Sequence, residues 1–168
     1  MLCVPKIASA FFLSVTAAVT IETAAARDTQ LTTRSLVEMR DFSGVAISPD
    51  GAVVAFREER ASIERNTYDS VWYVGRLDGG AAPVRIAEGG VPLRNGGQAV
   101  NEAPQWSPDS QWIYYRALIG GEVQIWRASR NGTRTERVSE DAADIEAYQL
   151  SPDGNRLIYR VGATREAV

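Results

Sequence analysis

The sequence predicts an all-β fold: an incomplete β-propeller of about two and a half four-stranded antiparallel blades, placed after a signal peptide. The first observation is a turn phrase that occurs three times, at Ser48–Gly51, Ser107–Ser110 and Ser151–Gly154. The second is the β-rich run behind each phrase, in which an aromatic residue stands eight places after the serine and an arginine nine places after it. A four-stranded unit that recurs about every 40–50 residues is typical of propellers.

Each phrase has the chemistry of a tight turn between two strands. Proline fixes φ at the first corner, aspartate can accept a hydrogen bond from the backbone two residues later, and glycine takes the position with positive φ. The Val, Ile, Tyr, Phe and Trp residues that follow favour strands. We therefore expect Phe56, Tyr115 and Tyr159 to occupy equivalent places on successive sheets.

The first 26 residues are predicted to be a secretory signal peptide. Lys6 supplies a positive charge, residues 7–21 are uncharged and mostly apolar or small, and residues 24–26 fit a small-residue cleavage site. The apolar run is shorter than the roughly 20 residues of a spanning helix. We therefore expect a periplasmic or secreted protein without a stable membrane anchor. Cleavage would remove Cys3, the only cysteine.

Residues 27–43 are expected to form an N-terminal segment with a short helix, capped by Thr33 and ending by Gly44. The partial propeller is then expected over residues 44–168. Blade 1 is predicted over about residues 44–90. Its strands are expected at 45–47, 53–57, 71–74 and 84–86.

A loop is expected at about 91–102, before blade 2 at about 103–140. Turn dipeptides stand at matching places in the two blades, at Asp78-Gly79 and Asn131-Gly132, and such dipeptides are a strong hairpin signal. Partial blade 3 is predicted over about 145–168. The strands of these two blades are expected at 104–106, 112–118, 123–126, 135–138, 147–150 and 157–161.

The serines of the three phrases are 59 and 44 residues apart, so blade 1 carries extra residues. Comparison of the turn positions places these insertions at Glu59–Asp69 and Gly89–Asn101. Insertions in propellers map to loops, often on the working face. Long loops can equally be tolerated without a function.

The residue types exclude the usual catalytic and cofactor sites within this chain. There is no histidine, so no Ser-His-Asp triad can form, and there is no Gly-x-Ser-x-Gly elbow. Phosphate loops, zinc-binding Cys/His clusters and calcium loops are also lacking. We therefore expect no catalytic residue, cofactor or metal, and a chain that is inactive by itself. A net charge of −3 does not suggest nucleic-acid binding.

The candidate substrate-binding residues are Arg57, Arg116 and Arg160, with Arg60 and Arg65 from the first insertion. Equivalent positions in successive blades point the same way, so the first three should form part of a ring or stripe. Such a stripe could bind peptide carboxylates through forked hydrogen bonds. The alternative is that the arginines pair with carboxylates of neighbouring blades.

Other repeated residues are assigned to the fold. The aspartates of the turn phrases are expected to cap the backbone rather than bind a metal. Seven aromatic residues are predicted to pack between blades, because propeller sheets bury both faces. These residues are Trp72, Trp106, Trp112, Trp126, Tyr73, Tyr114 and Tyr115.

Longer segments at residues 56–69, 106–117 and 159–167 resemble the lasso peptide isopeptidases, a branch of the prolyl oligopeptidase family of serine peptidases. The resemblance covers essentially all of residues 31–168. It implies the N-terminal propeller part of a periplasmic enzyme. A Ser-Asp-His triad in a C-terminal α/β-hydrolase domain would open the isopeptide bond of a threaded lasso peptide.

No position of this chain matches the triad, so no catalytic residue is carried over from the family. The implied partners are the hydrolase domain and a peptide substrate bound through the full-length protein. Two alternatives stay open. One is a non-enzymatic periplasmic binding propeller of the Tol type, and the other is the propeller of a dipeptidyl or oligopeptidase that acts on linear peptides.

Overall fold

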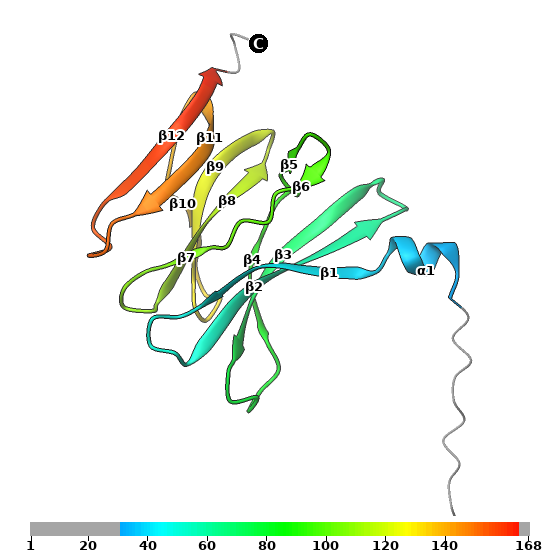
Figure 1. The fold of residues 1–168 in the computed structure, drawn as a ribbon, viewed down its shortest axis with the longest axis horizontal. Helices are drawn as coiled ribbons and strands as arrows, with labels where there is room; N and C mark the ends of the chain where they lie inside the picture. The colour runs from blue at the N-terminus through cyan, green and yellow to red at the C-terminus, as the bar shows by residue number, and fades with distance from the viewer. Residues whose placement is uncertain (1–30, 165–168) are drawn as a thin grey trace, which may run out of the picture. The chain divides into compact units, whose positions relative to one another are not determined.

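The computed structural model describes residues 31–164, which are mostly β-strand (Figure 1). A four-stranded sheet, a small hairpin, a second four-stranded sheet and a two-stranded sheet follow one another along the chain. All strand pairs within them are antiparallel. The predicted signal peptide lies outside the described residues. Within residues 31–164, no helix has the length and apolarity needed to cross a bilayer.

The short N-terminal helix is present, but its boundaries differ from the prediction. Helix α1 spans Thr33–Val37, and its N-cap is Thr32 rather than Thr33, because the Thr32 hydroxyl accepts a hydrogen bond from the Ser35 N–H at 3.1 Å. Strand β1 (Arg40–Ile47) begins well before Gly44. The reason is pairing, since Arg40 lies opposite Arg60 of the second strand.

The first sheet contains β1, β2 (Val53–Ser62), β3 (Thr67–Arg76) and β4 (Val84–Glu88), in chain order. Side chains of β2 alternate between two environments, as expected for a strand. Val53, Ala55, Arg57 and Glu59 are buried, while the residues between them are only half-buried. One face of this sheet is therefore covered, and the other is more open.

The second sheet contains β7 (Gln105–Trp106), β8 (Trp112–Ile119), β9 (Glu122–Ser129) and β10 (Thr135–Arg137). The third pairs β11 (Ala143–Leu150) with β12 (Leu157–Thr164). Each predicted strand of these blades overlaps an observed one. The arrangement of successive antiparallel sheets is that of an incomplete propeller.

Two apolar clusters hold successive sheets together. The first joins Val53, Ala55 and Trp72 of the first sheet to Ile113 and Tyr115 of the second. The second cluster joins the second and third sheets through a further set of buried side chains. Its buried members are Tyr114, Ile125, Ile145, Tyr148 and Leu150.

Six of the seven aromatic residues predicted to pack between blades are in these clusters or against them. Trp106 and Trp126 pack on the first cluster, and Trp112 packs on the second. Tyr73 differs, because it lies on the more open face of the first sheet. Its ring stacks on Phe56 there, with centroids 5.7 Å apart.

The first insertion is not a loop, contrary to the prediction. Residues 59–69 lengthen β2 and β3 into one hairpin, in which Ser62 lies opposite Thr67 and Asn66 takes a positive φ of 47° in the turn. The second insertion contains a small hairpin of β5 (Arg94–Asn95) and β6 (Gln98–Ala99). Both hairpin tips lie at the same end as the β8–β9 turn (Figure 1).

The three turn phrases have one hydrogen-bond pattern, which confirms the capping role of their aspartates. In the first, the Ser48 hydroxyl donates to Asp50 Oδ1, which also accepts from the Ala52 N–H at 3.0 Å. Asp109 and Asp153 accept the same two hydrogen bonds. Ser110 replaces the expected glycine and still takes a positive φ of 59°.

Candidate functional site

The three repeated arginines make one contact in common. In each blade, the arginine Nε lies within hydrogen-bonding distance of one particular side chain. This partner is the residue that stands five positions before the first serine of the turn phrase. These pairs are Arg57–Ser43 at 3.2 Å, Arg116–Glu102 at 2.7 Å and Arg160–Glu146 at 2.9 Å. The repeat therefore gives the Nε of each arginine a partner at the same place in the sequence, and two of the three partners are carboxylates.

Arg57 is buried at the boundary between the first two sheets. Its side chain is 5% exposed and forms an ion pair with Glu59 at 2.8 Å. It also donates to the Val100 carbonyl at 3.0 Å and lies over the Trp72 ring. These contacts tie the first sheet to the segment that enters the second.

Arg116 makes the corresponding contact one blade later. Its Nη1 donates to the Ile145 carbonyl at 2.9 Å and to the Glu146 carbonyl, both in β11. The Arg116 side chain is 11% exposed, whereas that of Arg160 is 73% exposed. Arg116 is therefore held between the second and third sheets, and Arg160 presents most of its surface to solvent.

Arg116 and Arg160 line one cleft, at the same end of the sheets as the inserted hairpins. Its volume is about 550 Å³. Arg94 and Asn95 of β5 form one wall, and Glu146 is the carboxylate among the lining residues. The apolar part of the lining consists of Leu93, Val100, Val123 and Ile145. We refer to this cavity as the arginine cleft.

Arg60 and Arg65 lie outside the lining of the arginine cleft. Arg60 lies 3.6 Å from Glu38, after α1. Arg65, at the tip of the long β2–β3 hairpin, pairs with Asp69. The structure therefore brings together two of the five arginines that the sequence singled out, and places the other three elsewhere.

Arg94 was not among the predicted site residues. Its guanidinium lies 4.8 Å from the centre of the Tyr68 ring and donates to the Gly97 carbonyl at 3.4 Å. The repeat gave no signal for Arg94, because the inserted hairpin has no counterpart in the second blade. The available signal was an arginine close to Gly96 and Gly97 in an insertion, since insertions often lie on the working face.

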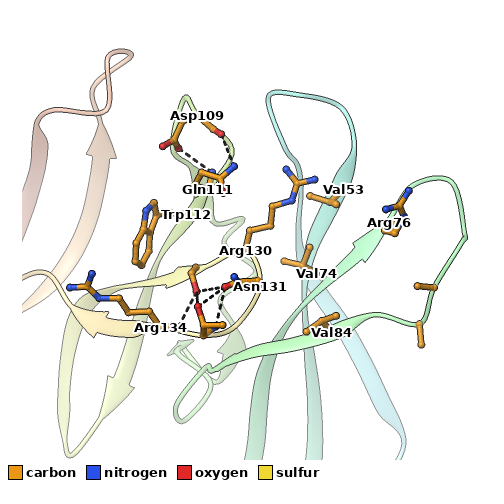
Figure 2. A pocket seen from close by; sticks show the side chains of 14 residues that line it. Val53, Val74, Arg76, Val84, Asp109, Gln111, Trp112, Arg130, Asn131 and Arg134 are labelled. Atoms are coloured by element: carbon orange, nitrogen blue, oxygen red, sulfur yellow. Dashed lines mark hydrogen bonds between the residues drawn. The ribbon is translucent and has the colours of Figure 1, made fainter.

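A second cleft, of about 600 Å³, opens at the opposite end of the first two sheets. Figure 2 shows Val53, Val74 and Val84 on the side of the first sheet. The side of the second sheet carries Trp112, Arg130 and Arg134, as Figure 2 also shows. These residues surround the turn phrases rather than the insertions.

The arginines of the second cleft already have carboxylate partners. Arg130 reaches Asp50 of the first sheet at 2.5 Å, Arg76 pairs with Asp78, and Arg134 pairs with Glu136 at 2.8 Å. The Ser48 hydroxyl, the Ala52 N–H and Arg130 together lower the pKa of Asp50 to about 2. The charges of this cleft thus serve contacts within the fold.

The residues that line the arginine cleft have the chemistry of a binding site for an anion. Guanidinium groups beside apolar side chains can bind an anionic group that carries an apolar neighbour. A peptide carboxylate fits this description.

Comparisons with known proteins agree with this fold. No protein-family model matches the chain. The lasso peptide isopeptidase AtxE2 of Asticcacaulis excentricus is 34% identical over 127 residues, which cover 68% of this chain and 18% of AtxE2. The chain therefore spans less than a fifth of the length of that relative.

Solved structures give the same result. A variant of AtxE2 isopeptidase with Astexin3 bound superposes with a TM-score of 0.71 and 31% identity, covering 77% of this chain and 23% of that one. The β-propeller domain of the Trilobed protease from Pyrococcus furiosus superposes with a TM-score of 0.52 and 19% identity, covering 76% of this chain and 36% of that domain. The second match shows the propeller fold alone.

Proposed function

By homology the chain belongs to the family of the lasso peptide isopeptidase AtxE2, and we propose that it is the N-terminal propeller part of a periplasmic serine peptidase that opens the isopeptide bond of a threaded peptide. The agreement with AtxE2 in both sequence and structure carries this proposal. Catalysis would come from a Ser-Asp-His triad in a C-terminal α/β-hydrolase domain, since the chain itself contains no histidine.

The propeller part would select and hold the peptide. Arg116 and Arg160 line the arginine cleft and would face the bound peptide. Arg57 would act indirectly. It donates a hydrogen bond to the carbonyl of Val100 and so would hold in place the segment that ends at this cleft-lining residue. Arg60 and Arg65 would meet the peptide only outside the cleft, along the long β2–β3 hairpin.

Titration with a threaded peptide tests this role. Threaded Astexin3 and an unthreaded peptide of the same sequence would be titrated into the 168-residue chain by isothermal calorimetry. We expect the threaded form to bind at least about tenfold more tightly, a difference of about 1.4 kcal/mol. Equal binding would favour a propeller that serves linear peptides. Binding of neither form would contradict a peptide-holding role.

The periplasmic location is a separate part of the proposal and rests on residues 1–26. Their charged start, apolar run and small-residue end are the features of an export signal. Fusion of residues 1–30 to alkaline phosphatase, which is active only after export, would test it. We expect enzyme activity from the fusion and none from a control in which residues 7–21 are deleted. Equal activity of the two fusions would contradict export by this segment.

A further inference from the structure

We infer that the arginine cleft recognises a peptide carboxylate and that Arg94, on the β5–β6 hairpin, is the residue that selects for it. The inference rests on the proposed function for the peptide nature of the ligand. It adds the chemical group that is recognised and a residue that the repeated arginines did not reveal.

Arg94 stands apart from nearly all other arginines of the described chain. Among residues 31–164, only Arg94 and Arg156 form no ion pair with a carboxylate. Arg156 follows the third turn phrase and directly precedes β12, whereas Arg94 lines the cleft. The cleft therefore contains a guanidinium whose charge is not balanced by any carboxylate of the described residues.

Three arginines and one glutamate line the cleft. Arg116 and Arg160 are each paired with a carboxylate, so the excess positive charge of the cleft is that of Arg94. Arg116 is fixed by the Glu102 carboxylate and two carbonyls of β11, so its position does not depend on a ligand. Arg160 is held by Glu146 through Nε. A positive potential in a cleft with apolar walls attracts an anion more strongly than the same charges in open water would.

The contacts that Arg94 makes within the chain are weak enough to be replaced by contacts with a ligand carboxylate. The guanidinium lies 4.8 Å from the centre of the Tyr68 ring, which is 44% exposed, and a cation–π contact at an exposed site contributes little. Its hydrogen bond to the Gly97 carbonyl is long, at 3.4 Å. A carboxylate could accept two parallel hydrogen bonds from the same guanidinium, and such charge-assisted pairs are stronger.

The hairpin that carries Arg94 is suited to this exchange. Its strands have two residues each, and Gly96 and Gly97 join them with φ values of 55° and 83°. The neighbouring Leu93 and Val100 are half-buried and line the cleft beside Arg94. A carboxylate bound here would thus lie next to apolar walls that can accept an aliphatic side chain.

Fluorescence anisotropy with three labelled octapeptides of Gly, Ala and Leu tests the inference on the 168-residue chain. The first peptide has a free C-terminal acid, the second a C-terminal amide, and the third is the amide with one internal Asp. We expect the first or third peptide, or both, to bind about tenfold more tightly than the second. Binding of the first points to a terminal carboxylate, and binding of the third to a side-chain carboxylate.

Three variants identify the residue responsible. We expect Arg94→Gln to weaken binding of the acidic peptides about tenfold and to leave binding of the amide peptide unchanged. Arg94→Lys should have an intermediate effect on the acidic peptides, because lysine keeps the positive charge but cannot donate two parallel hydrogen bonds to a carboxylate. Arg156→Gln is the matched control, since it removes the other unpaired arginine, and should leave binding unchanged. Circular dichroism of Arg94→Gln should match the parent chain, because the side chain is exposed.

The inference is overturned if the acid and amide peptides bind alike, if no peptide binds, or if Arg94→Gln and Arg156→Gln behave alike. Its failure is distinct from failure of the proposed function. If the chain prefers the threaded peptide and Arg94→Gln leaves that preference unchanged, only the selection for a carboxylate is overturned. If acidic peptides bind in a way that depends on Arg94 but the chain shows no preference for a threaded form, only the role in recognising threaded peptides is overturned.

Discussion

The rings of Trp72 and Tyr115 pack against each other across the boundary between the first two sheets, with their centroids 5.4 Å apart. Both side chains are almost fully buried, at 1% and 2% exposure. The Tyr115 hydroxyl also donates to the Glu88 carbonyl at 3.2 Å, and burial raises the pKa of Tyr115 well above its usual value. This pair joins the apolar core to the edge strand β4.

Truncation of Tyr115 should therefore destabilise the chain strongly. We expect Tyr115→Ala to lower the free energy of unfolding by about 3–5 kcal/mol, as for other large-to-small aromatic changes in a core. Tyr115→Phe should cost only about 1 kcal/mol, through the lost hydrogen bond. Urea unfolding followed by tryptophan fluorescence measures both. Tyr159→Ala, at the equivalent but 39% exposed position, is the control, and an equally large loss there would contradict this account.

The contact of Arg116 with β11 should contribute to the packing of the third sheet on the second. We expect Arg116→Ala to cost about 1–3 kcal/mol, because it leaves the partly buried Glu102 carboxylate and two carbonyls of β11 without their donor. Arg160→Ala, which removes a 73% exposed side chain, should change stability by about 0.5 kcal/mol or less. Equal losses in the two variants, measured by urea unfolding, would argue against a special role for Arg116.

The sequence predicted the parts of the fold that repeat. Phe56, Tyr115 and Tyr159 lie on successive second strands as expected, because one turn phrase sets the register of each hairpin. Thr32 capping could not be inferred, since Thr32 and Thr33 are both good N-caps and only the backbone path distinguishes them. Arg94 was missed for a related reason, because a residue in an unrepeated insertion has no counterpart from which to infer its direction.

The first turn phrase should weaken in acid. The pKa of Asp50 is lowered to about 2, chiefly by the Ser48 hydroxyl, and the usual value for aspartate in an unfolded chain is about 3.9. A carboxyl whose pKa is lower in the folded state than in the unfolded state stabilises the folded state fully at pH values above its unfolded-state pKa. This stabilisation is lost as the pH falls through the folded-state pKa. We therefore expect the turn to loosen between about pH 4 and pH 2.

Amide hydrogen exchange of Ala52 and Val53 across that pH range measures the effect, after correction for intrinsic exchange rates. Asp50→Asn should remove the acid-dependent part of their protection. Asp41→Asn, which changes a carboxylate outside the turns, should leave it in place. An Asp50 carboxyl that titrates near pH 4 by NMR would contradict the prediction.

The purified 168-residue chain should show no serine hydrolase activity. It contains no histidine, so no serine can be activated in the way that a Ser-His-Asp triad requires. We expect no turnover of a p-nitrophenyl ester above the buffer rate and no labelling by a fluorophosphonate probe. Stoichiometric labelling of a serine would show that the chain activates a nucleophile by another route.

Substitution of Gly90 should disturb the path from the first sheet to the arginine cleft. Gly90 has a φ of 73°, and an added Cβ would lie 2.5 Å from the Leu118 carbonyl oxygen, well inside van der Waals contact. The next residue, Val91, donates to that same oxygen at 2.9 Å. The backbone at residue 90 therefore cannot move away without breaking the hydrogen bond that anchors the second insertion to β8.

Gly51→Ala provides a matched control for this substitution. Gly51 has a similar φ of 68°, but an added Cβ would meet nothing within 4 Å. We expect Gly51→Ala to cost about 1–2 kcal/mol from the left-handed conformation alone. Gly90→Ala should cost a further 1–3 kcal/mol or so from the collision, as measured by urea unfolding. Because the insertion carries Arg94, Gly90→Ala should also weaken binding of the acidic octapeptide, whereas Gly51→Ala should not. Equal effects of the two variants on stability and binding would show that contact with Leu118 does not position the hairpin.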